Sequence, residues 1–352
     1  AVIISPDETI WSPPVSLRGL AIALCLLVLQ LSCTPQAARA GENVTARIRA
    51  LSHINRPARV LSFPADKSCG GFIIFDQDKE GELKFRSFKA QGTISVPPDK
   101  IAAYFPNHVF FADPHVLDKL PANAFDFIEV RYGSLQDSDE GRSDPAVATL
   151  SRFTSLVAMD LQQSELTDKA ISSLGALQNL EALYLFGNMI RGKCFKELSA
   201  LKKLKFLGLQ GNGIEPAYTH SLLDFPALET LLLSRNQLKN EQVKVLARIK
   251  TLQNLGIQGN VGVDDAVVPA LLQMKNLRHL NIQGTAISEQ GQKQLSRLKL
   301  ETYYCNSPSL SGKTAQAAAG KGVKGKSSGP KKSSGSEEWA SLFEPISRNR
   351  KP

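Results

Sequence analysis

The 352-residue sequence is poor in the residues that build metal centres and disulfide frameworks. It has five cysteines and five histidines. The histidines lack H-E-x-x-H and H-x-H spacing, and no two cysteines stand at the spacing of a metal-binding pair. Beyond residue 40 the cysteines are Cys69, Cys194 and Cys305, and three widely separated thiols do not make a disulfide framework. We therefore expect no metal, no cofactor and no catalytic residues, and predict that the protein is not an enzyme.

The sequence also lacks a hydrophobic run long enough to cross a bilayer. The longest run, residues 20–31, is about a dozen residues, whereas a spanning helix needs roughly 20. Arg18 precedes this run, and Ala38 and Ala40 follow it directly before Gly41, as in a secretory signal peptide. We expect residues 1–40 to be a signal peptide and the protein to be exported, either periplasmic or secreted. Membrane attachment by an uncleaved signal anchor is the alternative.

The sequence does have a leucine register that returns about every 24 residues. It begins at Leu156 and continues to Leu300. Each unit follows the pattern L-x-x-L-x-L-x-x-N-x-I, as in Leu180, Leu183, Leu185, Asn188 and Ile190. Repeats of this length predict a solenoid, and the pattern resembles the leucine-rich repeat family over residues 156–305. The resemblance implies an α/β fold, a curved solenoid with parallel strands on the concave side and helices on the convex side.

The repeat also assigns a role to its asparagines. In L-x-L the two leucines point to one side of a short strand and the intervening residue points to the other. The asparagine then turns the chain, where its amide can bind backbone groups that the turn leaves open. In the proteins that this sequence resembles, such residues form an asparagine ladder, here predicted to be Asn188, Asn212, Asn236 and Asn260. Ser164 and Thr285 replace asparagine and predict weaker steps.

Residues 41–153 do not keep the 24-residue register. Short alternating segments at 71–76, 83–88 and 92–96 are separated by turn residues and predict a small antiparallel β module. A solenoid exposes apolar surface at its end, so we expect this module to cap the first repeat. Residues 125–132 suggest a degenerate strand of the stack, with Ile128 and Val130 pointing inward.

The last segment, residues 307–352, consists mainly of Gly, Ser, Ala and Lys. It has nine basic and three acidic residues, so it carries +6 of the net charge of +9. We predict a disordered tail that attracts anionic surfaces such as lipid or cell wall, without specific nucleic-acid binding; a solubilising linker is the alternative. Trp339, Leu342 and Phe343 have the spacing of one docking helix turn or form a chance cluster. The predicted segments are thus 1–40, 41–153, 154–306 and 307–352.

The candidate binding surface lies between the leucines, at positions expected to be exposed on the concave face. Several of these residues are uncharged and partly apolar, as in an interface core. The predicted ligand-binding residues are Tyr184, Phe186, Phe206 and Leu232, with His279 and Asn281 as rim contacts. A glutamine row, Gln162, Gln210, Gln258 and Gln283, runs beside them; it binds a polar ligand, is a framework ladder or is ordinary solvated surface.

These patterns lead to a functional hypothesis. We expect a non-enzymatic scaffold that recognises a protein partner through its concave face. The alternative is a structural envelope-associated protein tethered by its basic tail. An enzyme built on residues 41–150 is a third class, which no motif supports.

Overall fold

The computed structural model describes residues 55–77, 83–130, 143–307 and 309–313. The predicted signal peptide and all but the first few residues of the predicted tail lie outside the described residues. Nearly all described residues belong to one compact unit.

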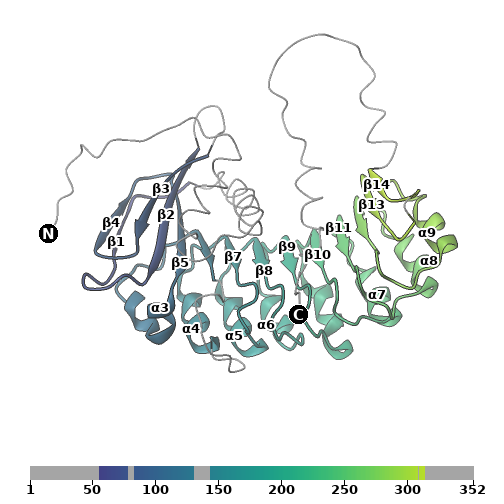
Figure 1. Ribbon diagram of the computed structural model, residues 1–352, viewed down its shortest axis with the longest axis horizontal. Helices are drawn as coiled ribbons and strands as arrows, with labels where there is room; N and C mark the ends of the chain where they lie inside the picture. Colours follow the sequence, from purple (N-terminus) through teal and green to yellow (C-terminus); the bar gives the residue numbers. More distant parts are fainter. Residues whose placement is uncertain (1–54, 78–82, 131–142, 308, 314–352) are drawn as a thin grey trace, which may run out of the picture. The chain divides into compact units, whose positions relative to one another are not determined.

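Within the described residues, the main element is a sheet of twelve strands whose central strands are all parallel. The strands stack in chain order, so each repeat pairs with the next one (Figure 1). The parallel strands are β5 (Ile101–Pro106), β6 (Phe127–Glu129), β7 (Ala158–Asp160), β8 (Ala182–Tyr184), β9 (Phe206–Gly208), β10 (Thr230–Leu232), β11 (Asn254–Gly256), β12 (His279–Asn281) and β13 (Thr302–Tyr304).

Short helices return the chain between these strands along the other side of the sheet (Figure 1). They are α4 (Asp144–Thr149), η4 (Leu150–Arg152), α5 (Asp168–Ser173), η5 (Leu174–Ala176), α6 (Phe195–Leu198), η6 (Pro216–Asp224), α7 (Asn240–Leu246), η7 (Asp265–Val267), α8 (Val268–Leu271) and α9 (Glu289–Leu295). Ser288 caps α9 by accepting a hydrogen bond from Gly291 N at 3.2 Å. Pro216 and Pro269 stand in first turns, where a missing N–H is tolerated. The fold is therefore a leucine-rich repeat solenoid, with strands on its concave side and helices on its convex side.

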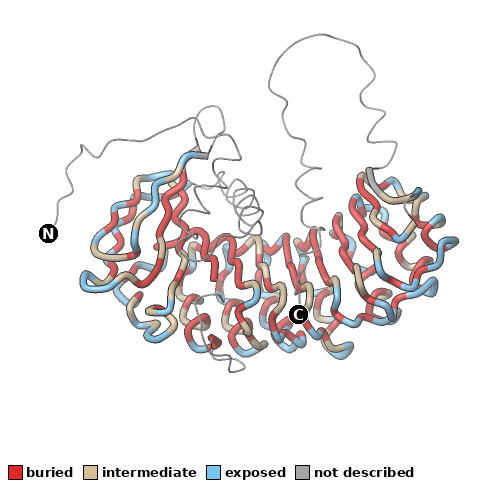
Figure 2. The backbone as a smooth tube through the Cα atoms, viewed as in Figure 1, coloured by how far each residue is buried: buried red, intermediate tan, exposed pale blue. Residues whose placement is uncertain are grey.

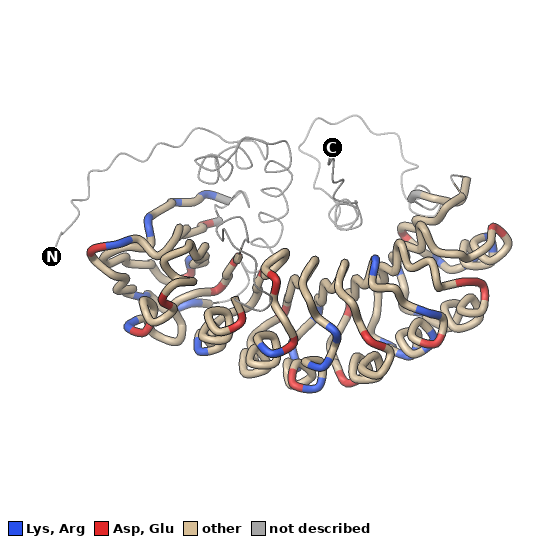
Figure 3. The backbone as a smooth tube through the Cα atoms, turned by 60° about the horizontal axis from the view of Figure 1, so that its bottom comes forward, with Lys and Arg blue, Asp and Glu red and all other residues tan. Residues whose placement is uncertain are grey.

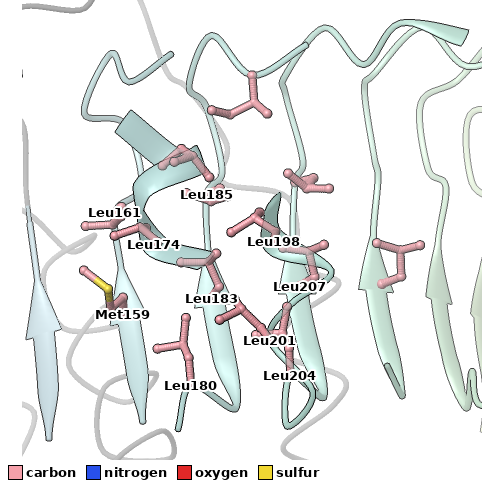
Figure 4. Close-up of a cluster of buried hydrophobic side chains, with 14 of the residues drawn as sticks. Met159, Leu161, Leu174, Leu180, Leu183, Leu185, Leu198, Leu201, Leu204 and Leu207 are labelled. Atoms are coloured by element: carbon pink, nitrogen blue, oxygen red, sulfur yellow. The ribbon is translucent and has the colours of Figure 1, made fainter. Parts of the chain in front are cut away.

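The leucines of the repeat form one continuous core between the strands and the helices. Leu183, Leu185 and Leu207 are fully buried and lie beside Leu198 and Leu201 from the helical side (Figure 4). Burying one such side chain contributes roughly 1.5–3 kcal/mol. The strands form the most continuously buried part of the chain (Figure 2). Each repeat covers the leucines of its neighbour.

The asparagine side chains connect successive repeats by hydrogen bonds. Asn188 Oδ1 accepts from Ser164 N and Leu166 N, both at 3.1 Å, and its Nδ2 donates to Leu161 O at 2.8 Å. Asn260 binds the preceding repeat in the same way. In contrast, Asn236 donates to Leu209 O at 2.8 Å, but its Oδ1 has no partner within the described residues. Among the four asparagines, Asn236 therefore has the weakest connection to the preceding repeat, and Thr285, which replaces asparagine, donates only to Ile282 O of its own repeat at 2.7 Å.

The N-terminal strands belong partly to the same sheet. The predicted segments form β2 (Gly70–Gln77), β3 (Leu83–Lys89) and β4 (Thr93–Val96). β2 pairs antiparallel with β5, β3 lies next to β2 at the edge, and β4 pairs antiparallel with β1 (Arg59–Ser62). The prediction of a degenerate strand is confirmed, because β6 pairs with β7. Its central residue Ile128 and the following Val130 are buried.

Contacts between aromatic rings join these N-terminal strands to the repeats. Phe125 stacks on Tyr104 at 4.8 Å between ring centroids and meets Phe153 edge-on at 4.7 Å. The chain also forms helices α3 (His108–Ala112) and η2 (Pro114–Leu117) beside this core. The sheet and core are therefore continuous across residue 153, where the sequence suggested a domain boundary. At the other end, β14 (Gly312–Lys313) pairs antiparallel with β13.

Candidate binding surface on the strand face

Each repeat strand has three residues, and the first and third point to the side opposite the leucine core. Because the strands pair in register, these residues form two rows. We call them the first row and the third row, after the position of their residues in each strand. The first row is Phe127, Ala158, Ala182, Phe206, Thr230, Asn254, His279 and Thr302. The third row is Glu129, Asp160, Tyr184, Gly208, Leu232, Gly256, Asn281 and Tyr304.

An apolar cluster separate from the core lies on this face. The rings of Tyr184 and Phe206 are 4.3 Å apart between centroids and inclined by 34°. Phe206 and Leu232 pack together, and Ala182, Tyr184 and Tyr304 pack against them. We call these five residues the strand-face cluster. The sequence pattern identified three of its members and missed Ala182 and Tyr304.

A glycine makes room for the Phe206 ring in this cluster. Gly208 stands between Tyr184 and Leu232 in the third row. A Cβ atom at this position would lie 3.2 Å from Cε1 of Phe206 and 3.1 Å from Oε1 of Gln210. Both distances are shorter than an ordinary carbon contact, so a larger residue would displace the ring.

The expectation that all six predicted contact residues are exposed is wrong. Phe206 is 7% exposed and Leu232 is 1% exposed, whereas Tyr184 and Phe186 are half-buried. His279 and Asn281 are 3% and 1% exposed. Side chains on neighbouring strands lie only about 4.8 Å apart and cover one another, and a single sequence does not show this packing.

His279 and Asn281 make hydrogen bonds inside the sheet instead of forming an exposed rim. His279 Nδ1 lies 2.6 Å from Thr302 Oγ1, and its Nε2 lies 3.7 Å from Glu301 Oε2. Burial lowers the pKa of His279 because it disfavours the charged ring, while Glu301 acts in the opposite direction. Asn281 donates to Gln258 Oε1 at 3.4 Å and accepts from Gln283 N at 3.1 Å.

Phe186 and the glutamine row are the other residues that the sequence predicts to face a ligand. Phe186 lies against Gly211, where a Cβ atom would approach its ring carbon Cε2 to 3.2 Å. In the glutamine row, Gln258 accepts the hydrogen bond from Asn281, and no side-chain hydrogen bond joins two of these glutamines within the described residues. The structure thus does not show a glutamine ladder there.

Charge is distributed unevenly over the repeats. Most Lys, Arg, Asp and Glu residues lie on the turns and the helical side, and few lie along the strands (Figure 3). Glu129 on β6 and Asp160 on β7 are an exception, because they are direct partners in the third row. Both side chains are buried. Extending the repeat register back to residue 128 would have predicted this acidic pair.

Three further observations concern the described residues. A cavity of about 640 Å³ lies at the turns that follow the second to fourth repeat strands. It is lined by Met189, Arg191, Gly213, Ile214, Glu215, Pro216, Asn236, Gln237, Lys239 and Gln242. No group of three or more His, Cys, Asp or Glu residues within the described ranges has a geometry suited to a metal ion. No described helix has the length and apolar character needed to cross a membrane.

Comparison with known proteins gives structural similarities only. Neither a protein-family profile nor a curated protein matches the chain. An internalin (InlF) from Listeria monocytogenes is 20% identical, with a TM-score of 0.40 over 53% of this chain and 48% of that chain. A Bacteroides fragilis protein is 14% identical, with a TM-score of 0.37 over 73% and 97%. The chain thus spans about half the length of the internalin, and similarity this low assigns no partner or activity.

Proposed function

We propose that this chain is a non-enzymatic scaffold that recognises another protein through its strand face. The observation that supports this most strongly is the strand-face cluster itself. Tyr184, Phe206 and Leu232 stand on the side of the sheet opposite the leucine core, where they do not help to enclose that core. Aromatic, uncharged patches of this kind are typical of the centre of protein interfaces.

The burial of each residue suggests its role in the contact with a partner. Tyr184 and Phe186, which are half-buried, supply the surface that a partner touches. Phe206 and Leu232 form the floor that holds the Tyr184 ring in place. Strand pairing and the hydrogen bonds of most ladder asparagines hold this arrangement in place, so little side-chain freedom is lost on binding. His279 and Asn281 belong to the polar end of the same face and position neighbouring strands.

The proposal also includes the cellular location, which is inferred from the sequence. The pattern of residues 18–41 supports export, so the partner would be met in the periplasm or outside the cell. The second candidate is a structural envelope protein held by the basic segment, which the +6 charge of residues 307–352 favours.

A crosslinking capture from intact envelopes separates the two candidates. Three chains beginning at Gly41 are compared: the parent, a chain that ends at Lys313, and the Tyr184→Ala, Phe206→Ala double variant. Ending at Lys313 keeps β14, which pairs with β13. One defined protein that is lost only from the double variant supports recognition by the strand face. Capture that depends only on residues beyond Lys313, and falls with added salt, contradicts it and supports tethering.

A further inference from the structure

The cavity at the turns that follow β8, β9 and β10 has the size of a site for a small molecule. Its volume of about 640 Å³ lies within the range of roughly 300–1,000 Å³ that is typical of such sites. None of its lining residues belongs to the strand-face cluster. The cavity is open to solvent, because Arg191, Gly213 and Lys239 in its wall are exposed. It therefore offers a binding surface that is distinct from the strand-face cluster.

The cavity lies where the connection between neighbouring turns changes. Gly213 N donates to Ile190 O at 3.2 Å, so a backbone hydrogen bond joins the turns after β8 and β9. Between the turns after β9 and β10, the buried Gln242 side chain takes this role. Its Nε2 donates to Ile214 O at 3.3 Å, and its Oε1 accepts from Lys239 N at 3.0 Å. A side chain thus connects these two turns beside the cavity, where a backbone hydrogen bond connects the previous two.

Gly213 keeps part of the cavity free of side chains. It has the same position in its repeat as Met189 and Gln237, which are each 24 residues away. A Cβ atom at Gly213 would have no neighbouring atom within 4 Å. The φ angle of Gly213 is not positive, so the turn does not require a glycine. A larger residue would therefore be tolerated by the backbone and would reach into open space.

One buried acceptor in the cavity wall lacks a donor. Asn236 lines the cavity and is 1% exposed, and its Oδ1 has no hydrogen-bond partner within the described residues. The same atom of Asn260 accepts from two backbone N–H groups of the preceding repeat. The equivalent groups for Asn236 belong to Asn212 and Ile214, and Oδ1 accepts from neither. Buried polar atoms are nearly always paired, so this atom favours a ligand that brings a donor.

The charges around the cavity leave one cation without a partner. The three charged lining residues, Arg191, Glu215 and Lys239, stand 24 residues apart, at one position of successive repeats. Arg191 Nη1 lies 3.1 Å from Glu215 Oε1, so these two charges neutralise each other. Lys239 has no ion pair within the described residues and can attract an anion.

The rest of the wall is partly apolar. Met189 is 38% exposed, which is unusual for a large hydrophobic residue in the described part of this chain. Ile214 and Pro216 also line the cavity. Methionine is flexible and adapts to ligands of irregular shape. The cavity therefore suits a ligand that combines an apolar group, a carboxylate and an N–H.

We propose that this cavity binds an N-acylated apolar amino acid, either free or as the last residue of a peptide. Its carboxylate pairs with Lys239, its N–H donates to Asn236 Oδ1, and its side chain packs against Met189 and Pro216. In such a ligand the three groups are attached to one carbon atom, so a single small cavity can contact all of them. The site goes beyond the proposed recognition by the strand face and does not depend on it.

Ligand-observed NMR titration of the full-length chain tests the chemistry of the ligand. The probes are N-acetyl-leucine, acetyl-alanyl-alanyl-leucine and N-acetyl-leucinamide, which lacks the carboxylate. We expect saturable binding of both carboxylates, and binding of the amide that is about tenfold weaker or more because a charged hydrogen bond is lost. Tighter binding of the tripeptide would identify a peptide end as the ligand, and equal affinities would identify the free amino acid.

Two variants test the position of the site. Gly213→Leu should fill the cavity and abolish binding of all three probes, whereas Val261→Leu, at the same position of a repeat outside the cavity, should change nothing. Lys239→Gln should weaken binding of the carboxylates about tenfold and leave that of the amide unchanged. The thermal transition of each variant shows that it is folded, and Lys239→Gln provides the test if Gly213→Leu does not fold.

No saturable binding of either carboxylate by the folded chain would overturn the proposal. Unchanged binding by folded Gly213→Leu would overturn it as well, because the probes would then bind elsewhere. An amide that binds as tightly as the carboxylates would exclude the proposed role of Lys239. Capture of a protein through Tyr184 and Phe206 is unaffected by any of these results, so the proposed function is tested separately.

Discussion

The rings of Tyr184 and Phe206 pack against each other on the side of the sheet that faces away from the leucine core, 4.3 Å apart between centroids. An aromatic pair of this kind contributes about 0.5–1.5 kcal/mol beyond the area it buries. That is small beside a core in which each leucine contributes roughly 1.5–3 kcal/mol. The geometry of the pair therefore adds little to the stability of the core, which agrees with the recognition role that we propose for it.

The hydrogen bonds of the ladder asparagines predict that replacing different asparagines has unequal effects on stability. Asn260 and Asn236 each donate to two backbone carbonyls, but Asn260 also accepts from Asn236 N and Leu238 N. Asn260→Ala should therefore lower the free energy of unfolding by about 1–3 kcal/mol more than Asn236→Ala, because it leaves buried N–H groups without acceptors. Urea denaturation of both variants measures the difference. Equal losses would show that the missing acceptor contacts of Asn236 have no energetic consequence.

A buried ion network should hold the N-terminal strands in place. Asp126 accepts from Arg56 Nε at 2.7 Å, Arg59 at 3.0 Å and Ala102 N at 2.7 Å. Removing its charge leaves two buried cations, and breaking such a pair typically costs about 3–5 kcal/mol. Asp126→Asn should lose that much in thermal or urea unfolding.

The matched control for this network is the ion pair of Asp76 with Lys100, whose side chains are partly exposed. Asp76→Asn should change the free energy of unfolding by no more than about 1 kcal/mol. A loss as small as this for Asp126→Asn would mean that the buried network does not stabilise the fold.

His279 should make stability depend on pH. Its pKa in the folded chain is lowered, mainly by burial, below the ordinary histidine value of about 6.5. The unfolded chain then binds a proton that the folded chain does not, so stability falls as pH drops from about 6.5 toward the folded pKa. His279→Gln should reduce the loss of stability between pH 7.5 and 5.5. Parallel curves for the parent and His279→Gln would contradict the effect.

The three described cysteines should be unreactive in the folded chain. Cys69, Cys194 and Cys305 are all buried, and burial raises the pKa of each thiol. Because the thiolate is the reacting form, a thiol-reactive disulfide at pH 8 should label none of them rapidly in a chain that begins at Gly41. All three should react in denaturant. Rapid labelling of the native chain would show that a thiol is accessible.

The repeats could be predicted because one residue type recurs at one position. Leu183, Leu207 and Leu231 have the same inward position in successive strands, and hydrophobic periodicity alone determines it. The strand residues on the other face follow from the same register. The burial of these residues cannot be predicted from the register, because the packing of Phe206 and Leu232 depends on contacts between repeats and on a glycine neighbour.

Contacts between distant residues outside the repeat register could not be predicted. Asp126 meets Arg56 and Arg59 across 70 and 67 residues, and no spacing rule connects them. The capping strands were predicted as a separate module, since their alternation differs from the repeat pattern. Their continuity with the solenoid depends on the parallel pairing of β5 with β6, which hydrophobic pattern does not reveal.

The most direct test of strand-face recognition is the affinity of the captured partner for the purified chain. Calorimetry compares the chain ending at Lys313, its Tyr184→Ala, Phe206→Ala variant and a Val261→Ala control, each shown to be folded by its thermal transition. Central interface anchors cost at least 2 kcal/mol when truncated, so we predict that the double variant binds about 30-fold more weakly or worse. Unchanged affinity in a folded double variant would contradict recognition through the strand face.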